Sequence, residues 1–348
     1  MTAITPRRVL LCEDSRVYAT ALMRVLNYDG DITVAAVCVT AEETIAALPH
    51  VRPDIVIMDL ELPGMDGLKA VEEIMSSRPL PILVLSARVS DRNDKAAASL
   101  AAGAIDAIAK DDLDLHDPAG TAEAAFRRRV SMLTRARVIR HLRPELRAGS
   151  GSRHLARRAS VIGICASTGG PQVLAHLLAA LPADYPIPLL VVQHIGAGFT
   201  AGLAEWLDQT VRLRVAVARG GMQAGPGAWI APEGAHLKLA ATGKLYLDRR
   251  TVVGHHRPSG DVLLASIAEV AGRAGVAVVL SGMGADGAAG AAAVHARGGL
   301  AIAQDEESSA VYGMPKAAVD LGVELVLSPH EIAVSLLDLV HGPHLEVQ

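Results

Sequence analysis

Short apolar runs alternating with helix-like stretches constrain the fold of this chain more than any other feature. In the first third of the sequence such runs occupy residues 9–12, 32–37, 55–58, 82–85 and 104–109. Continuous apolar runs of four to eight residues are typical of strands that are buried on both faces of a parallel sheet. Their alternation with helices predicts a doubly wound α/β domain.

A second series of the same kind follows. Its runs lie at residues 161–165, 189–192, 213–217, 276–280 and 300–303, interrupted by a hairpin-like stretch at 236–248. The chain has 348 residues, enough for two domains, and because only 3% are aromatic, aliphatic side chains must fill the cores. We therefore expect a second doubly wound α/β domain.

An arginine-rich segment separates the two series. We expect domains at residues 1–125 and 158–348, joined over 126–157 by the end of a helix and a solvated linker. The segment lacks interleaved aromatic residues, and the chain has a net charge of -4. These features argue against nucleic acid as a partner.

Cysteine usage and hydropathy indicate the compartment. The three cysteines, Cys12, Cys38 and Cys165, are widely spaced and form no CxxC motif, which favours reduced thiols. The apolar runs are shorter than the roughly 18 residues that a membrane span requires. We expect a cytoplasmic protein with no insertion into the membrane.

Polar residues stand at the ends of strands in the first domain. Glu13 and Asp14 follow the first run, Asp59 follows the third, Ser86 ends the fourth and Lys110 ends the fifth. Parallel strands bring these ends to one edge, where crowded carboxylates suit Mg²⁺. Each residue alone has an ordinary explanation as a helix cap or a surface group. Together they predict that Asp59 accepts a phosphoryl group, with the hydroxyl and ammonium supporting it.

A serine stands at a strand-to-helix turn in the second domain. Ser167 follows the first run of that domain and precedes Thr-Gly-Gly-Pro at 168–171, where a helix running through Leu181 begins. A serine hydroxyl needs a base, and the base needs an acid to orient it. His194 and Asp286, both just beyond strand ends, supply these groups and predict nucleophilic attack on a carbonyl.

Rival interpretations of this turn are weaker. A glycine-rich turn also binds phosphates, but the segment matches neither GxGxxG nor GxxxxGK[ST]. Cys165 ends an apolar strand with no basic neighbour, so we expect a buried core cysteine. The order serine, histidine, aspartate differs from that of α/β-hydrolases, in which the histidine comes last.

Other histidines have plain explanations. His255 and His256 are adjacent, so they would face different ways on most regular backbones, and we interpret them as surface or substrate-loop residues. Glu233 and His236 either line a substrate groove or lie on a solvated turn, and the sequence leaves both open.

The first 125 residues resemble the receiver domain of response regulators. The resemblance rests on the strand-end residues together with MDLELPGMDG at 58–67. It implies that a histidine kinase phosphorylates Asp59, with Mg²⁺ held by Asp14, Asp59 and the carbonyl of Glu61 beside Glu13. The sequence departs from the pattern at Ala107, where receivers usually carry a switching aromatic residue, and at Asp111, where proline is usual.

Residues 158–340 resemble the protein-glutamate methylesterases of bacterial chemotaxis. The matching segments are CASTGGP at 165–171, QHIGAGFT at 193–200, HRPSGDVLL at 256–264, SGMGADG at 281–287 and AQDEESSAVYGMPKAA at 303–318. The resemblance implies hydrolysis of glutamyl methyl esters on chemoreceptors, with release of methanol, and often deamidation of receptor glutamines.

The same resemblance implies roles for single residues. Ser167 would be the nucleophile, His194 the general base and acid, and Asp286 the group that orients the histidine. The amides of Thr168 and Met283 would form an oxyanion hole, and the esterase step would need no cofactor. Residues 195–196, Ile-Gly, stand where the family usually has Met-Pro.

Two other classes of function remain as alternatives. One is a phosphorylation-dependent binding module with a relict serine site, against which the complete serine, histidine and aspartate set argues. The other is a receiver-controlled transcription factor, but no recognition helix or basic output domain is visible. We expect the unphosphorylated first domain to cover the second active site, and phosphate on Asp59 to shift that equilibrium.

Overall fold

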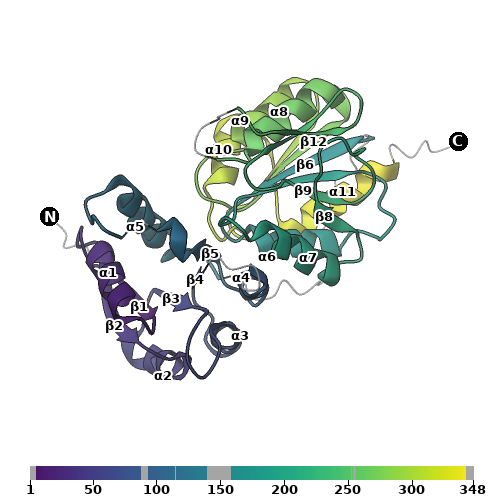
Figure 1. Cartoon of the computed structure of the whole chain (residues 1–348). Coiled ribbons are helices and arrows are strands. Elements are labelled where there is room, and N and C mark those ends of the chain that lie inside the picture. Colours follow the sequence, from purple (N-terminus) through teal and green to yellow (C-terminus); the bar gives the residue numbers. More distant parts are fainter. Residues whose placement is uncertain are drawn as a thin grey trace, which may run out of the picture. The chain divides into compact units, whose positions relative to one another are not determined.

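The chain folds into two compact α/β units, shown in Figure 1. The computed structural model describes residues 5–87, 93–113, 115–138, 158–251, 253 and 256–341. One unit comprises Met1–Arg140 with Ile195–Gly202, and the other comprises His141–His194 with Leu203–Gln348. No helix in the described parts of the chain is both long and apolar enough to cross a membrane.

A parallel sheet forms the centre of the first unit. Its order is β2 (Ile32–Cys38), β1 (Arg7–Cys12), β3 (Ile55–Asp59), β4 (Ile82–Ser86) and β5 (Asp106–Ala109). The helices are α1 (Arg16–Leu26), α2 (Ala41–Val51), α3 (Gly67–Ser77), α4 (Asn93–Ala101) and α5 (Thr121–Leu133). Helices α1 and α5 contact each other, while α3 contacts α2 and α4. The chain changes direction at β1, so the carboxyl ends of β1 and β3 form a crevice at one edge.

The second unit has a longer sheet whose strand pairs are all parallel. Its order is β14 (Leu325–Leu327), β13 (Leu300–Gln304), β12 (Gly275–Val279), β6 (Val161–Ala166), β7 (Leu189–Gln193), β9 (Ala228–Ile230) and β8 (Val215–Val217). An antiparallel hairpin, β10 (His236–Leu239) and β11 (Leu245–Asp248), stands apart. The switch in strand order falls at β6, between β12 and β7.

Helices cover this second sheet on both faces (Figure 1). They are α6 (Gly170–Ala179), α7 (Thr200–Thr210), α8 (Gly260–Ala271), α9 (Ala288–Ala296), α10 (Met314–Asp320) and α11 (Pro329–His341). Helix α9 contacts α8 and α10, and α11 contacts α6. The buried cluster beneath α8, α9 and α10 is built from Val, Leu, Ile and Ala with few rings, as the low aromatic content requires.

The predicted fold class is confirmed for both sheets. The sequence missed β9 and β14, because a strand of three residues carries too little apolar pattern to stand out. Strand β8 starts at Val215 instead of Leu213, and α6 stops at Ala179, short of Leu181. These are errors at element ends, where tertiary contacts decide the boundary.

Two helices, α2 and α11, begin with reciprocal capping bonds. The Thr40 hydroxyl accepts a hydrogen bond from the Glu43 amide, and the Glu43 carboxylate accepts one from the Val39 amide. At α11 the Ser328 hydroxyl and the Glu331 carboxylate cap each other's backbone amides. Such reciprocal bonds satisfy amides that a helix start leaves without partners.

The arginine-rich segment begins on the end of α5, where two of its arginines are paired with carboxylates. Arg127 is only 4% exposed, and its guanidinium donates a hydrogen bond to Asp29. Arg129 pairs with the buried Asp106 at 2.7 Å. Both arginines lie on α5 and hold that helix to the first unit. Residues 139–157 of the expected linker lie outside the described residues.

Candidate active site

Lys110 joins two carboxylates at the carboxyl edge of the first sheet. Its ammonium lies 2.7 Å from Asp59 Oδ2 and 2.8 Å from Glu13 Oε2. Both carboxylates are almost fully buried. Burial raises the pKa of Glu13, although the bond from Lys110 acts against it. Burial would lower the pKa of Lys110, but the two carboxylates outweigh it and raise it. A partly buried ammonium therefore offsets one of the two negative charges of this pair.

The same edge offers oxygen ligands for a divalent cation. Carboxylate oxygens of Glu13, Asp14 and Asp59 all lie within 4.8 Å of one another. The Glu61 amide donates a hydrogen bond to Asp59 Oδ1, which brings residue 61 to the same corner. Ser86, fully buried at the end of β4, donates to the carbonyl of Ala87. Clustered hard oxygen donors of this kind fit Mg²⁺.

An aromatic ring from α1, which no sequence pattern marks, lies against Lys110. Ala107 is fully buried in β5, opposite Val84. Tyr18, on α1, places its ring 4.8 Å from the Lys110 ammonium and donates its hydroxyl to the Lys110 carbonyl. Asp111 forms part of a short 3₁₀ turn that follows Lys110. An aromatic group from a different element thus contacts the predicted phosphoryl site.

Strand register in the second unit brings Ser167 and His194 together. Ala166 of β6 pairs with Gln193 of β7, so the residues that follow them leave adjoining strand ends. The His194 amide donates to the Ala166 carbonyl at 2.9 Å, which extends the pairing by one step. No hydrogen bond joins the Ser167 hydroxyl to His194 among the described contacts. In a free enzyme such contacts commonly tighten only when substrate binds.

Gln193 fixes both strand ends, a role that the sequence did not reveal. Its side chain is 4% exposed and donates hydrogen bonds of 2.8 Å to the carbonyls of Ser167 and His194. A side chain at Gly170 would collide with its carboxamide oxygen. Gly169, with φ of 74°, takes a left-handed conformation that glycine adopts most easily. Small residues at the turn therefore leave room for the amide that positions it.

Replacing Gln193 with leucine should destabilise the second unit. The change removes the Gln193 donor from both carbonyls, and although the Ser167 carbonyl still accepts from the Gly170 amide, losing these buried bonds should cost about 1–3 kcal/mol of unfolding free energy. Urea titration followed by tryptophan fluorescence measures this loss, because both tryptophans, Trp206 and Trp229, belong to the second unit. The matched change Gln209→Leu on exposed α7 should stay within about 0.5 kcal/mol of wild type. Equal effects of the two changes would contradict the role of Gln193.

Asp286 is held by the start of α8 and contacts His194. Its carboxylate accepts hydrogen bonds from the Ser259 hydroxyl at 2.7 Å, the Gly260 amide at 2.6 Å and the Asp261 amide at 3.0 Å. His194 Nε2 lies 2.8 Å from Asp286 Oδ2. The amides at a helix start favour an anion, so this arrangement keeps Asp286 ionised.

The protonation state of the pair follows from these contacts. Burial alone would raise the pKa of Asp286, but the bond from His194 and the three donors from α8 outweigh it and lower the pKa well below its usual range. A carboxylate only accepts hydrogen bonds, so a neutral His194 carries its proton on Nε2. Both ring nitrogens of His194 are buried and neither makes a hydrogen bond of good geometry within the described ranges, but Nε2 is the one that lies 2.8 Å from the carboxylate. In that tautomer Nδ1 carries the lone pair that can accept a proton.

The predicted oxyanion donors lie on two neighbouring loops. Thr168 is 3% exposed, and its carbonyl accepts a hydrogen bond from the Ser281 hydroxyl. The Ser167 amide donates to the Ser281 carbonyl, which holds the loop of residues 281–284 beside the serine. The Met283 amide donates to none of the residues that the structure describes. An amide without an acceptor beside the serine can stabilise negative charge on an acyl oxygen.

Other residues singled out by the sequence lie in different environments. Cys165 is fully buried in the core, as expected, and burial raises its pKa well above the ordinary thiol value. His236 lies on neither a groove nor a turn: it is fully buried in β10, and its Nδ1 accepts a hydrogen bond from the Ser259 amide. Glu233 is exposed on a turn. His255 lies outside the described residues.

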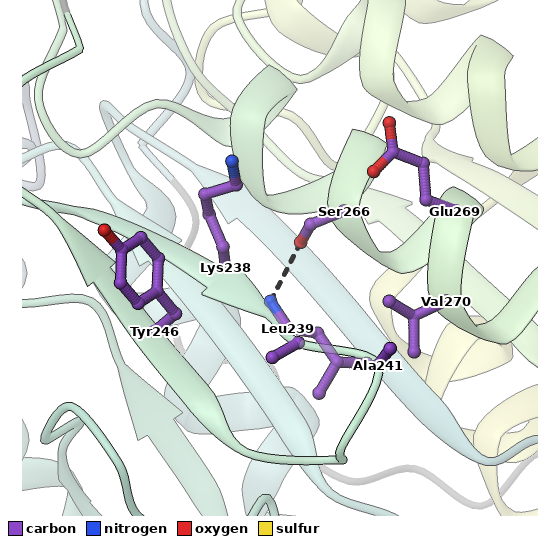
Figure 2. A pocket seen from close by; sticks show the side chains of 8 residues that line it. Lys238, Leu239, Ala241, Tyr246, Ser266, Glu269 and Val270 are labelled. Carbon is purple, nitrogen blue, oxygen red and sulfur yellow. Dashed lines mark hydrogen bonds between the residues drawn. The ribbon is translucent and has the colours of Figure 1, made fainter.

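Figure 2 shows a pocket between the β10–β11 hairpin and α8 that is distinct from this site. Leu239, whose amide donates to the Ser266 hydroxyl, lines it together with Lys238, Tyr246 and Glu269. The helix rises about 1.5 Å per residue, so Glu269 lies more than ~12 Å along α8 from Gly260, which contacts Asp286. None of the predicted site residues lines this pocket.

Both units of the chain are similar to known proteins. A family described as CheB methylesterase matches residues 162–336, and a family described as response regulator receiver domain matches residues 9–116. A protein-glutamate methylesterase/protein-glutamine glutaminase of Anaeromyxobacter dehalogenans is 42% identical over 96% of this chain and 97% of its own length. A protein of Myxococcus xanthus with the same description is 36% identical over 97% of this chain and 98% of its own.

One solved structure is similar to the second unit. The CheB methylesterase catalytic domain of Thermotoga maritima is 40% identical, with a TM-score of 0.50, and the match covers 52% of this chain and 99% of that one.

Proposed function

This chain belongs to the CheB methylesterase family, and from that premise we propose that Ser167, His194 and Asp286 hydrolyse glutamyl methyl esters on chemoreceptors. The chain is a hydrolase with a response regulator receiver domain, and it serves chemotaxis adaptation under the control of phosphorylation. The same attack on a receptor glutamine would release ammonia and leave glutamate. The names of its relatives include both activities.

The proposed reaction has two halves. His194 Nδ1 takes the proton of the Ser167 hydroxyl while the oxygen attacks the ester carbon, and the resulting oxyanion accepts hydrogen bonds from the amides of Thr168 and Met283. The intermediate collapses, methoxide takes the proton from His194, and methanol leaves an acylated Ser167. Water then loses a proton to Nδ1 and attacks the acyl carbon, which frees the glutamate and restores the serine.

One observation carries this proposal. His194 lies on the strand end beside Ser167 and has its other nitrogen 2.8 Å from a carboxylate that stays ionised. The ionised Asp286 stabilises the imidazolium that forms when the serine proton is taken. Incubating the protein with methylated receptor fragments and measuring methanol tests the activity. A relict serine site that only binds receptors would release none.

We further propose that Asp59 is the phosphoryl acceptor and that a histidine kinase of the chemosensory pathway is the donor. Glu13, Asp14, Asp59 and the carbonyl of Glu61 would hold Mg²⁺, which neutralises charge on the phosphoryl oxygens. Lys110, already 2.7 Å from Asp59, and Ser86 would contact the transferred group. We propose no cofactor for the ester hydrolysis itself.

Acetyl phosphate with Mg²⁺ should raise methanol release, and Asp59→Asn should remove that rise. The rate of methanol release should rise about 5- to 150-fold, the range that an allosteric coupling of ordinary size produces. The matched change Asp31→Asn alters an exposed carboxyl before β2, at the opposite edge of the sheet, and should leave the rise intact. Chelation of the metal with EDTA should also remove it. An undiminished rise in Asp59→Asn would exclude this route of control.

Domain boundaries and location complete the proposal. We propose a receiver domain at residues 1–125 and a catalytic domain at 158–348, joined by 126–157, with α5 continuing past residue 125 to Leu133. The three cysteines are free and buried, which supports a reducing compartment such as the cytoplasm. We propose no contact with nucleic acid and no insertion into the membrane.

A further inference from the structure

His256 stacks directly on the proposed general base. The ring centroids of His194 and His256 lie 4.2 Å apart, and the ring planes differ by 9°. The His194 side chain is 11% exposed, whereas His256 is exposed. His256 therefore covers one face of the His194 ring from the solvent side.

The backbone that carries His256 is fixed at the same site. Three residues further on, the Ser259 hydroxyl donates to Asp286, and the Ser259 amide donates to Nδ1 of the buried His236. His236 Nε2 lies 3.2 Å from the Thr251 carbonyl, which fixes that ring in turn. A single segment thus holds the carboxylate by hydrogen bonds and lies against the base with an aromatic ring.

The stack supplies a constraint that Asp286 alone does not. One contact, at Nε2, leaves the His194 ring free to rotate about the line that joins it to the carboxylate. A flat ring against one face removes this freedom and keeps Nδ1 directed toward the serine end of β6. Reaction rates depend on such alignment, because a misplacement of about 1 Å costs about 100-fold.

The geometry excludes a metal site made by the two histidines. Nitrogen lone pairs lie in the plane of an imidazole, so parallel rings stacked face to face direct them side by side and not at a common ion. In addition, His194 Nε2 is already engaged by Asp286.

We propose that His256 is a positioning residue that holds the His194 imidazole in its reactive orientation by stacking. The inference rests on the role proposed above for His194. The proposed role requires a flat ring at position 256 and does not require a nitrogen that titrates. Phenylalanine should therefore replace the histidine, whereas alanine should not.

Two variants and one probe test the inference. His256→Ala should lower kcat for methanol release by about 10- to 100-fold, with KM within about twofold of wild type. His256→Phe should restore kcat to within about threefold of wild type. A fluorophosphonate labels Ser167 because the serine oxygen displaces fluoride from phosphorus while His194 takes the proton. Its labelling rate should therefore rank wild type and the two variants in the same order as kcat does. His295→Ala, at an exposed histidine in the last turn of α9, should match wild type.

The probe separates this inference from the proposed substrate. Suppose that the wild-type protein releases no methanol, and that the labelling rate falls from wild type to His256→Phe and falls further to His256→Ala. This result would contradict the proposed substrate and support the stacking role of His256. Labelling of His256→Ala at the wild-type rate would overturn the stack. Labelling of His256→Phe as slow as that of His256→Ala, with thermal unfolding unchanged, would also overturn it, since a nitrogen would then be required.

Discussion

Replacing Ser167 with alanine should abolish methanol release from methylated receptor fragments, lowering kcat about 10⁴- to 10⁶-fold. The change removes the oxygen that would form the acyl intermediate in the proposed mechanism. Activity that remains would come only from water bound near the oxyanion donors. The assay is methanol production under saturating substrate with phosphodonor present.

The fold should tolerate this change. The Ser167 hydroxyl makes no hydrogen bond with any residue in the described parts of the chain, so alanine leaves no buried group without a partner. Ser160→Ala, at the residue directly before β6, is the matched control and should retain full activity. Retained methanol release in Ser167→Ala would move the nucleophile to another residue.

Replacing Asp286 with asparagine should lower kcat about 10³- to 10⁴-fold. An asparagine can turn its amide toward His194, so that Nε2 becomes the acceptor and Nδ1 carries the proton. The nitrogen facing the serine would then be unable to take a proton, and the charge that stabilises the imidazolium would be lost. Methanol release measured beside circular dichroism separates this effect from unfolding.

A neighbouring carboxylate provides the control for Asp286. Asp261→Asn changes the same chemical group at the same helix start, but the Asp261 carboxylate accepts from the Gly290 amide and does not contact His194. It should lose far less activity than Asp286→Asn. Equal losses would mean that the effect comes from the start of α8 and not from the orientation of His194.

Asp286 should also make stability depend on pH. Its pKa is lower in the folded protein than the ordinary 3.8, so the ionised carboxylate contributes stability that is fully present above pH 3.8. That contribution is lost as the pH falls below 3.8 toward the lowered pKa. Acid unfolding of Asp286→Asn should lack this component.

The sequence predicted the fold because buried parallel strands leave a plain signature. Each run from 9–12 to 300–303 corresponds to a strand in the structure, and the carboxyl ends of parallel strands share an edge. This rule alone brought Asp59 together with Lys110 and Ser167 together with His194. Strand β9 was not predicted, because its three residues form a strand only through pairing with β7 and β8, which a local pattern does not show.

The groups that orient the site could not be predicted in the same way. Gln193 and His256 act through single side-chain contacts across different loops, and no periodic pattern marks such contacts. Ser259 had only the ordinary signature of a helix cap, although it also binds Asp286. Tyr18 contacts Lys110 across 92 residues of sequence, which the departure at Ala107 did not suggest. Local patterns identify elements, whereas these contacts depend on the finished packing.

Mapping a fluorophosphonate adduct by mass spectrometry tests most directly whether Ser167 is the nucleophile. We predict one phosphonyl group, located on Ser167, with methanol release falling in proportion to labelling and no labelling of His194→Ala on the same time scale. Loss of activity with the adduct on another residue, or full labelling of Ser167 with methanol release intact, would contradict a mechanism based on Ser167, His194 and Asp286.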